Sequence, residues 1–127
     1  MKPVLVDTDI LINFLRGKEK AREFLRSQLE SGSILCSVIT VAEIFAGLRP
    51  HEQEKTADLL DNLEIIPITR AIAEKAGIYK GGIKSQSLEL DDCLIAATAH
   101  LHKATLATGN ARHYPMDDVE KITVGCD

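Results

Sequence analysis

Three acidic side chains occupy the places where a metal-dependent active site needs them. Asp7 directly follows the apolar run of residues 4–6, Glu43 lies in the first turn of a predicted helix, and Asp92 begins another. Carboxylates that are brought together repel one another and lose solvation, which costs stability unless a cation compensates. Mg²⁺ or Mn²⁺ prefers oxygen ligands and can activate water for hydrolysis of a phosphodiester. These acids therefore predict a Mg²⁺ or Mn²⁺ site with hydrolytic chemistry.

The elements that must position these acids alternate between short apolar strands and amphipathic helices. The pattern predicts strands at 4–6, 33–36, 64–68, 105–107 and 121–124, and helices at 10–15, 18–32, 40–47, 52–63, 70–79 and from Asp91 or Asp92 onward. Such alternation favours a parallel sheet covered on both faces. We predict an α/β fold, a three-layer α/β/α sandwich with a central, mostly parallel five-stranded sheet, formed by one domain over residues 1–127.

The fold class itself predicts where a ligand binds. In open α/β sheets, ligands bind outside the carboxyl ends of the strands, where the helices after them begin. Asp7, Glu43 and Asp92 all belong to that edge. Thr108 and Asn110, which come after the fourth strand, belong to it as well. We therefore expect these five side chains to converge.

Each acid also has a plainer interpretation. Asp7 can cap the helix that comes after its strand, and Thr40 with Glu43 forms the T-x-x-E pattern of a capping box. Asp91 and Asp92 can both be helix-start acids that favour the helix dipole. Adjacent residues on a helix diverge by about 100°, so we expect at most one of these two to point directly into a shared site.

The bulk composition places weak limits on function. The net charge of −4 gives no general attraction to nucleic acid, so such a substrate needs local basic residues or a metal ion. Cys36, Cys93 and Cys126 are odd in number and widely spaced, which favours reduced thiols over disulfides or a zinc site. No secretory leader and no apolar run long enough for a membrane span is evident. We expect a cytoplasmic protein without membrane contact.

Four ordered blocks of the sequence carry a family resemblance: VLVDTDILINFL, SVITVAEIFAGL, DDCLIAATAHLH and LATGNARHYP. They extend over nearly the whole chain, in order and at matching spacing. The chain resembles the PIN-domain nucleases and, within them, the ribonuclease toxins of the VapC type. The resemblance implies a Mg²⁺- or Mn²⁺-dependent endoribonuclease that acts on RNA as the toxin of a type II toxin–antitoxin pair. It also implies inhibition by a cognate antitoxin protein and assembly as a homodimer.

The resemblance carries the acids over one by one. Asp7 matches the first acid of the family pattern, Glu43 the second, and Asp92 in DCLIAA the third. These three are therefore implied as catalytic residues and metal ligands. Asp91 precedes the third acid and is implied as a supporting residue.

Further polar residues match or break the pattern. Thr8 matches a hydroxyl beside the first acid, and Asn110 matches the asparagine of the T-x-N block. His113 stands where many relatives carry a fourth acid, which bears on the number of metal ions. His113 can lie near the metal and favour Mn²⁺, contact phosphate or move a proton, or pack beside Tyr114 and do neither.

Residues 10–32 are predicted to form a helical hairpin that binds a partner. Phe14 can extend an apolar surface, while Arg16 and Lys18 can pair with an acidic antitoxin segment or with RNA phosphate. The alternative is that Phe14 and Phe24 are both core residues, because amphipathic helices usually bury their apolar face.

Two other functions compete with the nuclease. A haloacid-dehalogenase-like phosphatase would use Asp7 as nucleophile, but Leu11 does not match that pattern and Glu43 would have no task. A PIN-like module that binds RNA or protein without efficient cleavage is the other, and His113 and the acidic net charge agree with it.

Overall fold

A computed structural model describes residues 2–125 of the chain. Its centre is one five-stranded sheet in the order β3-β2-β1-β4-β5. The strands are β1 (Val4–Val6), β2 (Ile34–Ser37), β3 (Glu64–Ile66), β4 (Thr105–Thr108) and β5 (Lys121–Thr123). Every neighbouring pair is parallel. The predicted α/β fold is confirmed, and the sheet is parallel throughout.

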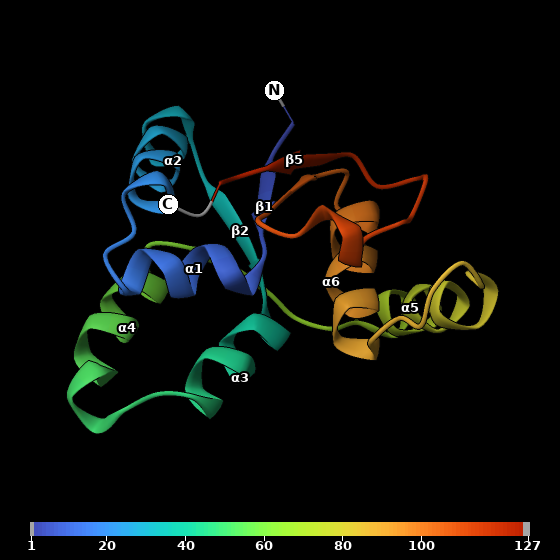
Figure 1. Cartoon of the computed structure of the whole chain (residues 1–127), viewed down its shortest axis with the longest axis horizontal. Coiled ribbons are helices and arrows are strands. Elements are labelled where there is room, and N and C mark those ends of the chain that lie inside the picture. The colour runs from blue at the N-terminus through green and yellow to red at the C-terminus, as the bar shows by residue number, and fades with distance from the viewer. Residues whose placement is uncertain (1, 126–127) are drawn as a thin grey trace.

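Six α-helices and two short 3₁₀ turns connect the strands within the described residues. They are α1 (Thr8–Leu15), α2 (Glu19–Ser31), α3 (Val38–Ala46), η1 (Pro50–Glu52), α4 (Gln53–Asp61), α5 (Arg70–Gly82), α6 (Leu90–Leu101) and η2 (Ala111–His113). Figure 1 shows α1 to α4 gathered on one side of the sheet and α5 with α6 on the other. This arrangement gives the predicted three layers.

Two separate apolar cores hold the layers together. Successive residues of a strand point to opposite faces, so Leu5 of β1 joins the core under α5 and α6, while Val6 joins the core under α1 and α2. Leu106 and Ala107 of β4 divide between the two cores in the same way. The sheet is therefore buried on both faces, as a parallel sheet requires.

Two predicted helix boundaries are wrong for local reasons. The helix predicted from Thr40 begins at Val38, because Ser37 ends β2 and its hydroxyl oxygen accepts from the Ile39 N–H at 3.1 Å. The helix predicted to stop before Gly81 and Gly82 runs through both residues. The first difference moves Glu43 from the first turn of its helix to the second.

The strand order shows where along the carboxyl edge the predicted site lies. The chain passes from β1 to β2 and β3 on one side, then returns to place β4 on the other side of β1. The carboxyl ends of β1 and β4 therefore form a switch point, the place where open α/β sheets bind ligands. Asp7 and Thr108 lie there.

Two of the remaining expectations concern the chain as a whole. Cys36 and Cys93 are buried free thiols, as predicted, and Cys126 lies outside the described residues. Among residues 2–125, no helix is long and apolar enough to cross a membrane.

Candidate active site at the carboxyl edge of the sheet

Asp7 links β1 to α1 and is almost completely buried, with 7% of its surface exposed. Its Oδ1 accepts from the Thr8 N–H at 2.7 Å, so Asp7 is the N-cap of α1, as its plainer interpretation predicted. Its Oδ2 accepts from the Thr108 hydroxyl at 2.8 Å. One carboxylate therefore caps the helix and joins β1 to the end of β4.

Glu43 of α3 reaches the same edge. The Thr8 hydroxyl donates to Glu43 Oε1 at 2.6 Å and lies 2.9 Å from the Thr40 hydroxyl. Ser37 caps α3, and Thr40 lies inside the helix. The capping-box interpretation of Glu43 is therefore wrong, and its carboxylate belongs to a contact between α1 and α3.

The two adjacent acids at the start of α6 face different neighbours. The Asp91 side chain hydrogen-bonds to Glu43, and its Oδ1 accepts from the Asp92 N–H at 2.9 Å. Asp92 Oδ1 accepts from the Tyr114 hydroxyl at 3.3 Å, and its Oδ2 lies 3.7 Å from His113 Nδ1. Both acids thus border the site, Asp91 on the α3 side and Asp92 on the side of the β4–β5 connection.

Crowding of these acids shifts their protonation. Burial, the Asp91 hydrogen bond and the charges of Asp91 and Asp7 raise the pKa of Glu43 to about 7. Burial and the same two charges raise the pKa of Asp92 to about 6. Both shifts have the sign expected for carboxylates that share a poorly solvated space.

The segment after β4 supplies the remaining predicted polar groups. The Asn110 N–H donates to the Thr108 hydroxyl oxygen at 3.0 Å, and its side-chain nitrogen lies 3.0 Å from His113 Nε2. His113 therefore lies between Asn110 and Asp92. This position is compatible with each of the three interpretations of His113, which stay predictions.

Two residues of this edge were missed at the sequence level. Tyr114 is 1% exposed, and its hydroxyl hydrogen-bonds to Asp92 and to Asp7. Asp9 places its Oδ2 3.0 Å from the Gly109 nitrogen, and burial together with the Asp7 charge raises its pKa to about 6. The sequence D-T-D at residues 7–9 was the available indication that Asp9 belongs to the site. It was not followed because residues two apart on a helix do not face each other.

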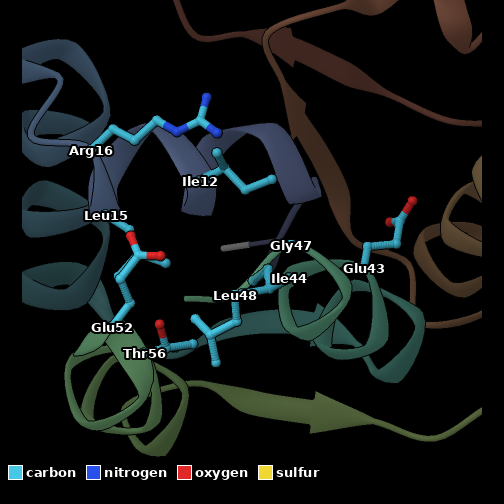
Figure 2. A pocket seen from close by; sticks show the side chains of 9 residues that line it. All are labelled: Ile12, Leu15, Arg16, Glu43, Ile44, Gly47, Leu48, Glu52 and Thr56. Atoms are coloured by element: carbon cyan, nitrogen blue, oxygen red, sulfur yellow. The ribbon is translucent and has the colours of Figure 1, made fainter. Parts of the chain in front are cut away.

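A small pocket of about 90 Å³ adjoins the acids between α1, α3 and the η1–α4 segment. Figure 2 shows Arg16 of α1 at one side of it and Glu43 at the other, with Glu43 turned away from Leu48. Thr56 at its α4 wall is fully buried, and its hydroxyl has no hydrogen-bond partner among the described residues.

The predicted partner residues lie around the α1–α2 junction, and of these Arg16 lines the same pocket as Glu43. Phe14 is partly buried against the core and also lines grooves between α1, α2 and α4, and its partner-binding role stays a prediction. Arg16 is exposed and Lys18 is half-buried at the α1–α2 junction. Phe24 packs against the core.

The donor set at the edge suits a hard divalent cation, because it consists of carboxylate oxygens with hydroxyl and amide neighbours. As the side chains stand, no three acidic, histidine or cysteine residues within 2–125 surround a single point. Like charges repel, and each acid turns to its own donor: Asp7 to Thr108, Glu43 to Thr8, and Asp92 to Tyr114.

Comparison with known proteins decides the family. Residues 4–119 match the PIN domain. The chain belongs to the PIN-domain family. This PIN domain is 38% identical over 115 residues to Ribonuclease VapC10 of Mycobacterium tuberculosis, a match that covers 89% of this chain and 86% of that protein. The resemblance seen in the four sequence blocks is confirmed.

Solved structures agree with the family match. A toxin–antitoxin complex from Klebsiella pneumoniae contains a chain with a TM-score of 0.79 and 31% identity, over 94% of this PIN domain and 96% of that chain. FitAcB from Neisseria gonorrhoeae gives a TM-score of 0.79 and 27% identity, over 94% and 96% respectively. Family membership rules out the haloacid-dehalogenase alternative, and Glu43, which that alternative left idle, has a place in the site.

Proposed function

We propose that this PIN domain is a metal-dependent endoribonuclease and the toxin of a type II toxin–antitoxin pair. The observation that carries the proposal is that Asp7, Glu43 and Asp92 lie along one edge of a parallel sheet, around its switch point, where the charge of Asp7 acts on both other acids. The relatives named as VapC ribonucleases support RNA as the substrate. Asp7, Glu43 and Asp92 would hold Mg²⁺ or Mn²⁺, with Asp91 beside them.

A bound Mg²⁺ or Mn²⁺ supplies positive charge that activates water for attack on the phosphodiester and stabilises the oxygen that leaves. Neighbouring residues of the chain fix the orientation of the acids. Thr108 and Thr8 orient Asp7 and Glu43 through their hydroxyl groups. Asn110 and His113 offer donors on the side of Asp92 where a phosphate would approach.

The test is cleavage of single-stranded RNA by the purified full chain. We expect cleavage with Mg²⁺ or Mn²⁺, loss of cleavage with EDTA, and recovery when the metal is restored in excess. Asp92→Asn serves as the inactive control, which excludes a contaminating nuclease. Cleavage that EDTA leaves unchanged, or that Asp92→Asn retains in full, would contradict the metal site.

The alternative of an RNA-binding or protein-binding module without efficient cleavage rests on one specific observation. His113 stands 3.7 Å from Asp92, at the position where the family resemblance implies a fourth acid. The same assay separates the two functions, because a binding module retains the RNA in a gel-shift experiment and leaves its length unchanged at every metal concentration.

We propose a cognate antitoxin as the protein partner, docked on the grooves between α1, α2 and α4. These grooves have volumes of about 560 and 360 Å³ and share Phe14, Leu29 and Leu59 as apolar walls. Leu29 is 44% exposed. The smaller groove is lined by the basic residues Arg22, Arg26 and Lys55, which complement an acidic amphipathic segment, whereas the larger one also carries Glu54 and Asp58. The neighbouring structures solved as toxin–antitoxin complexes support this partner.

Charge reversal tests the partner surface. Arg16→Glu with Lys18→Glu should weaken binding to a candidate antitoxin, and Leu29→Asp should weaken it through the groove. Isothermal titration would measure both, with Arg70→Glu on the far side of the molecule as the control. If both variants bind with unchanged affinity, the hairpin of residues 10–32 has a structural role and does not bind the antitoxin.

A homodimer is also part of the proposal. Phe45, Ile78 and Leu90 are large apolar side chains exposed by 41%, 66% and 51%, and they are candidates for contact with a second copy. Light scattering on the purified chain would measure the mass, and Phe45→Glu would test the contact.

A further inference from the structure

Asp9 makes a contact across the site that the proposed three-acid chemistry does not use. It is the second residue of α1, and its Oδ2 accepts from the Gly109 N–H at 3.0 Å. Its Oδ1 is buried and has no hydrogen-bond partner among the described residues. The bond joins the first turn of α1 to the residue directly after β4. It therefore fixes where the β4–β5 connection starts.

The segment after Gly109 gives this bond its importance. Asn110 comes next and meets His113 Nε2 through its side-chain nitrogen at 3.0 Å, and His113 faces Asp92. At the far end, Lys121 Nζ donates to the carbonyl oxygens of Tyr114 and Met116 at 2.7 and 2.9 Å. Side-chain hydrogen bonds from Asp9 and Lys121 thus hold both ends of the segment that presents Asn110 and His113.

Gly109 is the residue type that this contact requires. A Cβ built at position 109 would lie 2.7 Å from Asp9 Oδ2 and 3.4 Å from the Val124 carbonyl oxygen. A carbon cannot approach a carboxylate oxygen to 2.7 Å, so any larger residue displaces either Asp9 or the backbone. The close approach of this backbone to Asp9 explains glycine here.

We propose that Asp9 is a positioning residue of the nuclease site: through Gly109 it places Asn110 and His113 beside Asp92. The inference rests on the proposed function, and it adds a residue outside the three-acid site. Positioning needs an acceptor oxygen at Asp9 and does not need its negative charge. This requirement separates the role from that of a metal ligand or a proton donor.

Three variants test the requirement. Asp9→Ala removes the acceptor and should lower kcat for RNA cleavage by about 10-fold, the lower end of the cost of losing an outer-shell partner, because it displaces Asn110 as well as His113. Asp9→Asn keeps an oxygen that can accept from the Gly109 N–H and should recover most of that loss. Gly109→Ala should reproduce the Asp9→Ala defect, and the double variant should be no worse than the more impaired single one. Gly81→Ala in α5, where no atom lies within 4 Å of the new carbon, is the matched control.

Hydrogen exchange of the Gly109 amide gives a readout independent of activity. Exchange should be slow in the parent and in Asp9→Asn, and faster in Asp9→Ala, with core amides of β1 unchanged. If the parent does not cleave RNA, the proposed function fails, but this measurement still tests whether Asp9 holds the Gly109 amide. Full activity in Asp9→Ala, equal damage in Asp9→Asn and Asp9→Ala, or fast Gly109 exchange in the parent would each overturn the proposal.

Discussion

The acids of the site and the β4–β5 connection beside them reach the same edge by different means. Asp7, Glu43 and Asp92 sit at strand ends and on helices, and regular backbone hydrogen bonds fix their Cα positions. Asn110 and His113 lie in irregular chain that is held by Asp9 at its start and Lys121 at its end. Asp92 is where the two regions meet, because His113 faces it from the connection.

This difference predicts which substitutions affect a single side chain and which also move neighbouring residues. Replacing an acid on a helix or strand end removes chemistry and leaves the scaffold in place. Replacing a residue that holds the connection moves several groups together, because irregular segments open more easily than helices and strands.

The largest effect is expected from the acids. Asp7→Asn and Asp92→Asn should each lower RNA cleavage by more than the roughly 100-fold that outer-shell substitutions cost. Asparagine is also a good N-cap, so Asp7→Asn should keep α1 intact, and relief of like-charge repulsion should leave metal-free stability equal or higher. Cleavage kinetics and thermal melts check this, with exposed Asp61→Asn as control. If either variant unfolds, the replaced acid is needed for folding, and the expectation that acid substitutions leave the scaffold intact is wrong.

Asp91 should have a smaller effect. Its side chain hydrogen-bonds to Glu43, whereas Asp92 faces Tyr114 and His113. Asp91→Asn should therefore cost about 10- to 100-fold in kcat, as an outer-shell change does, and less than Asp92→Asn in the same assay. The reverse ranking would make Asp91 the metal ligand and move the site toward α3.

The sequence predicted that Asp7 and Asp92 lie at the carboxyl edge of the sheet, because the positions of these two acids depend on element ends alone. Asp7 after an apolar run and Asp92 at a helix start must share the carboxyl edge of any parallel sheet. Its pattern could not show that β4 lies beside β1, since strand order depends on packing of the whole chain. Because the strand order was unknown, the sequence could not indicate that Asp9 contacts Gly109, which is 100 residues away.

The sequence pattern predicted the wrong start for α3 because one residue belongs to both a strand and a helix. Ser37 ends β2 and caps α3 at once, so no loop separates strand from helix, and Thr40 looked like the cap. Gly81 and Gly82 were expected to stop the helix before them, but both have helical backbone and α5 ends at Gly82. Propensity sets such boundaries only weakly.

Stability of the metal-free protein should fall as pH rises through neutrality. Glu43 and Asp92 have pKa values of about 7 and 6 in the folded chain, above the ordinary values of 4.5 and 3.8. Between these limits the folded state binds more protons than the unfolded state, so the free energy of unfolding decreases with increasing pH. Melting temperatures in EDTA should be higher at about pH 5.5 than at about pH 7.5, and Glu43→Gln should flatten the difference. A rise toward the higher pH would contradict the crowding of acids.

Saturating Mg²⁺ above neutral pH should restore part of that loss, because a ligand that binds only the folded state stabilises it by mass action. Glu43→Gln and Asp92→Asn should show a smaller metal-dependent shift in melting temperature. An equal shift in the parent and both variants would place the bound ion elsewhere on the chain.

The smallest effect is expected at His113, on the connection side of the comparison. Its side chain is 54% exposed and 3.7 Å from Asp92 Oδ2, and an exposed contact contributes at most about 1 kcal/mol even as an ion pair. That corresponds to a change of less than about sixfold in cleavage by His113→Ala, with Mg²⁺ affinity unchanged. His113→Asp adds a carboxylate beside Asp92, so it should tighten Mg²⁺ binding and lower the metal-free melting temperature. Cleavage assays and metal titrations on both variants check this. If His113→Ala abolishes cleavage while metal binding stays intact, the imidazole contacts phosphate or moves a proton, and the connection carries chemistry as well as position.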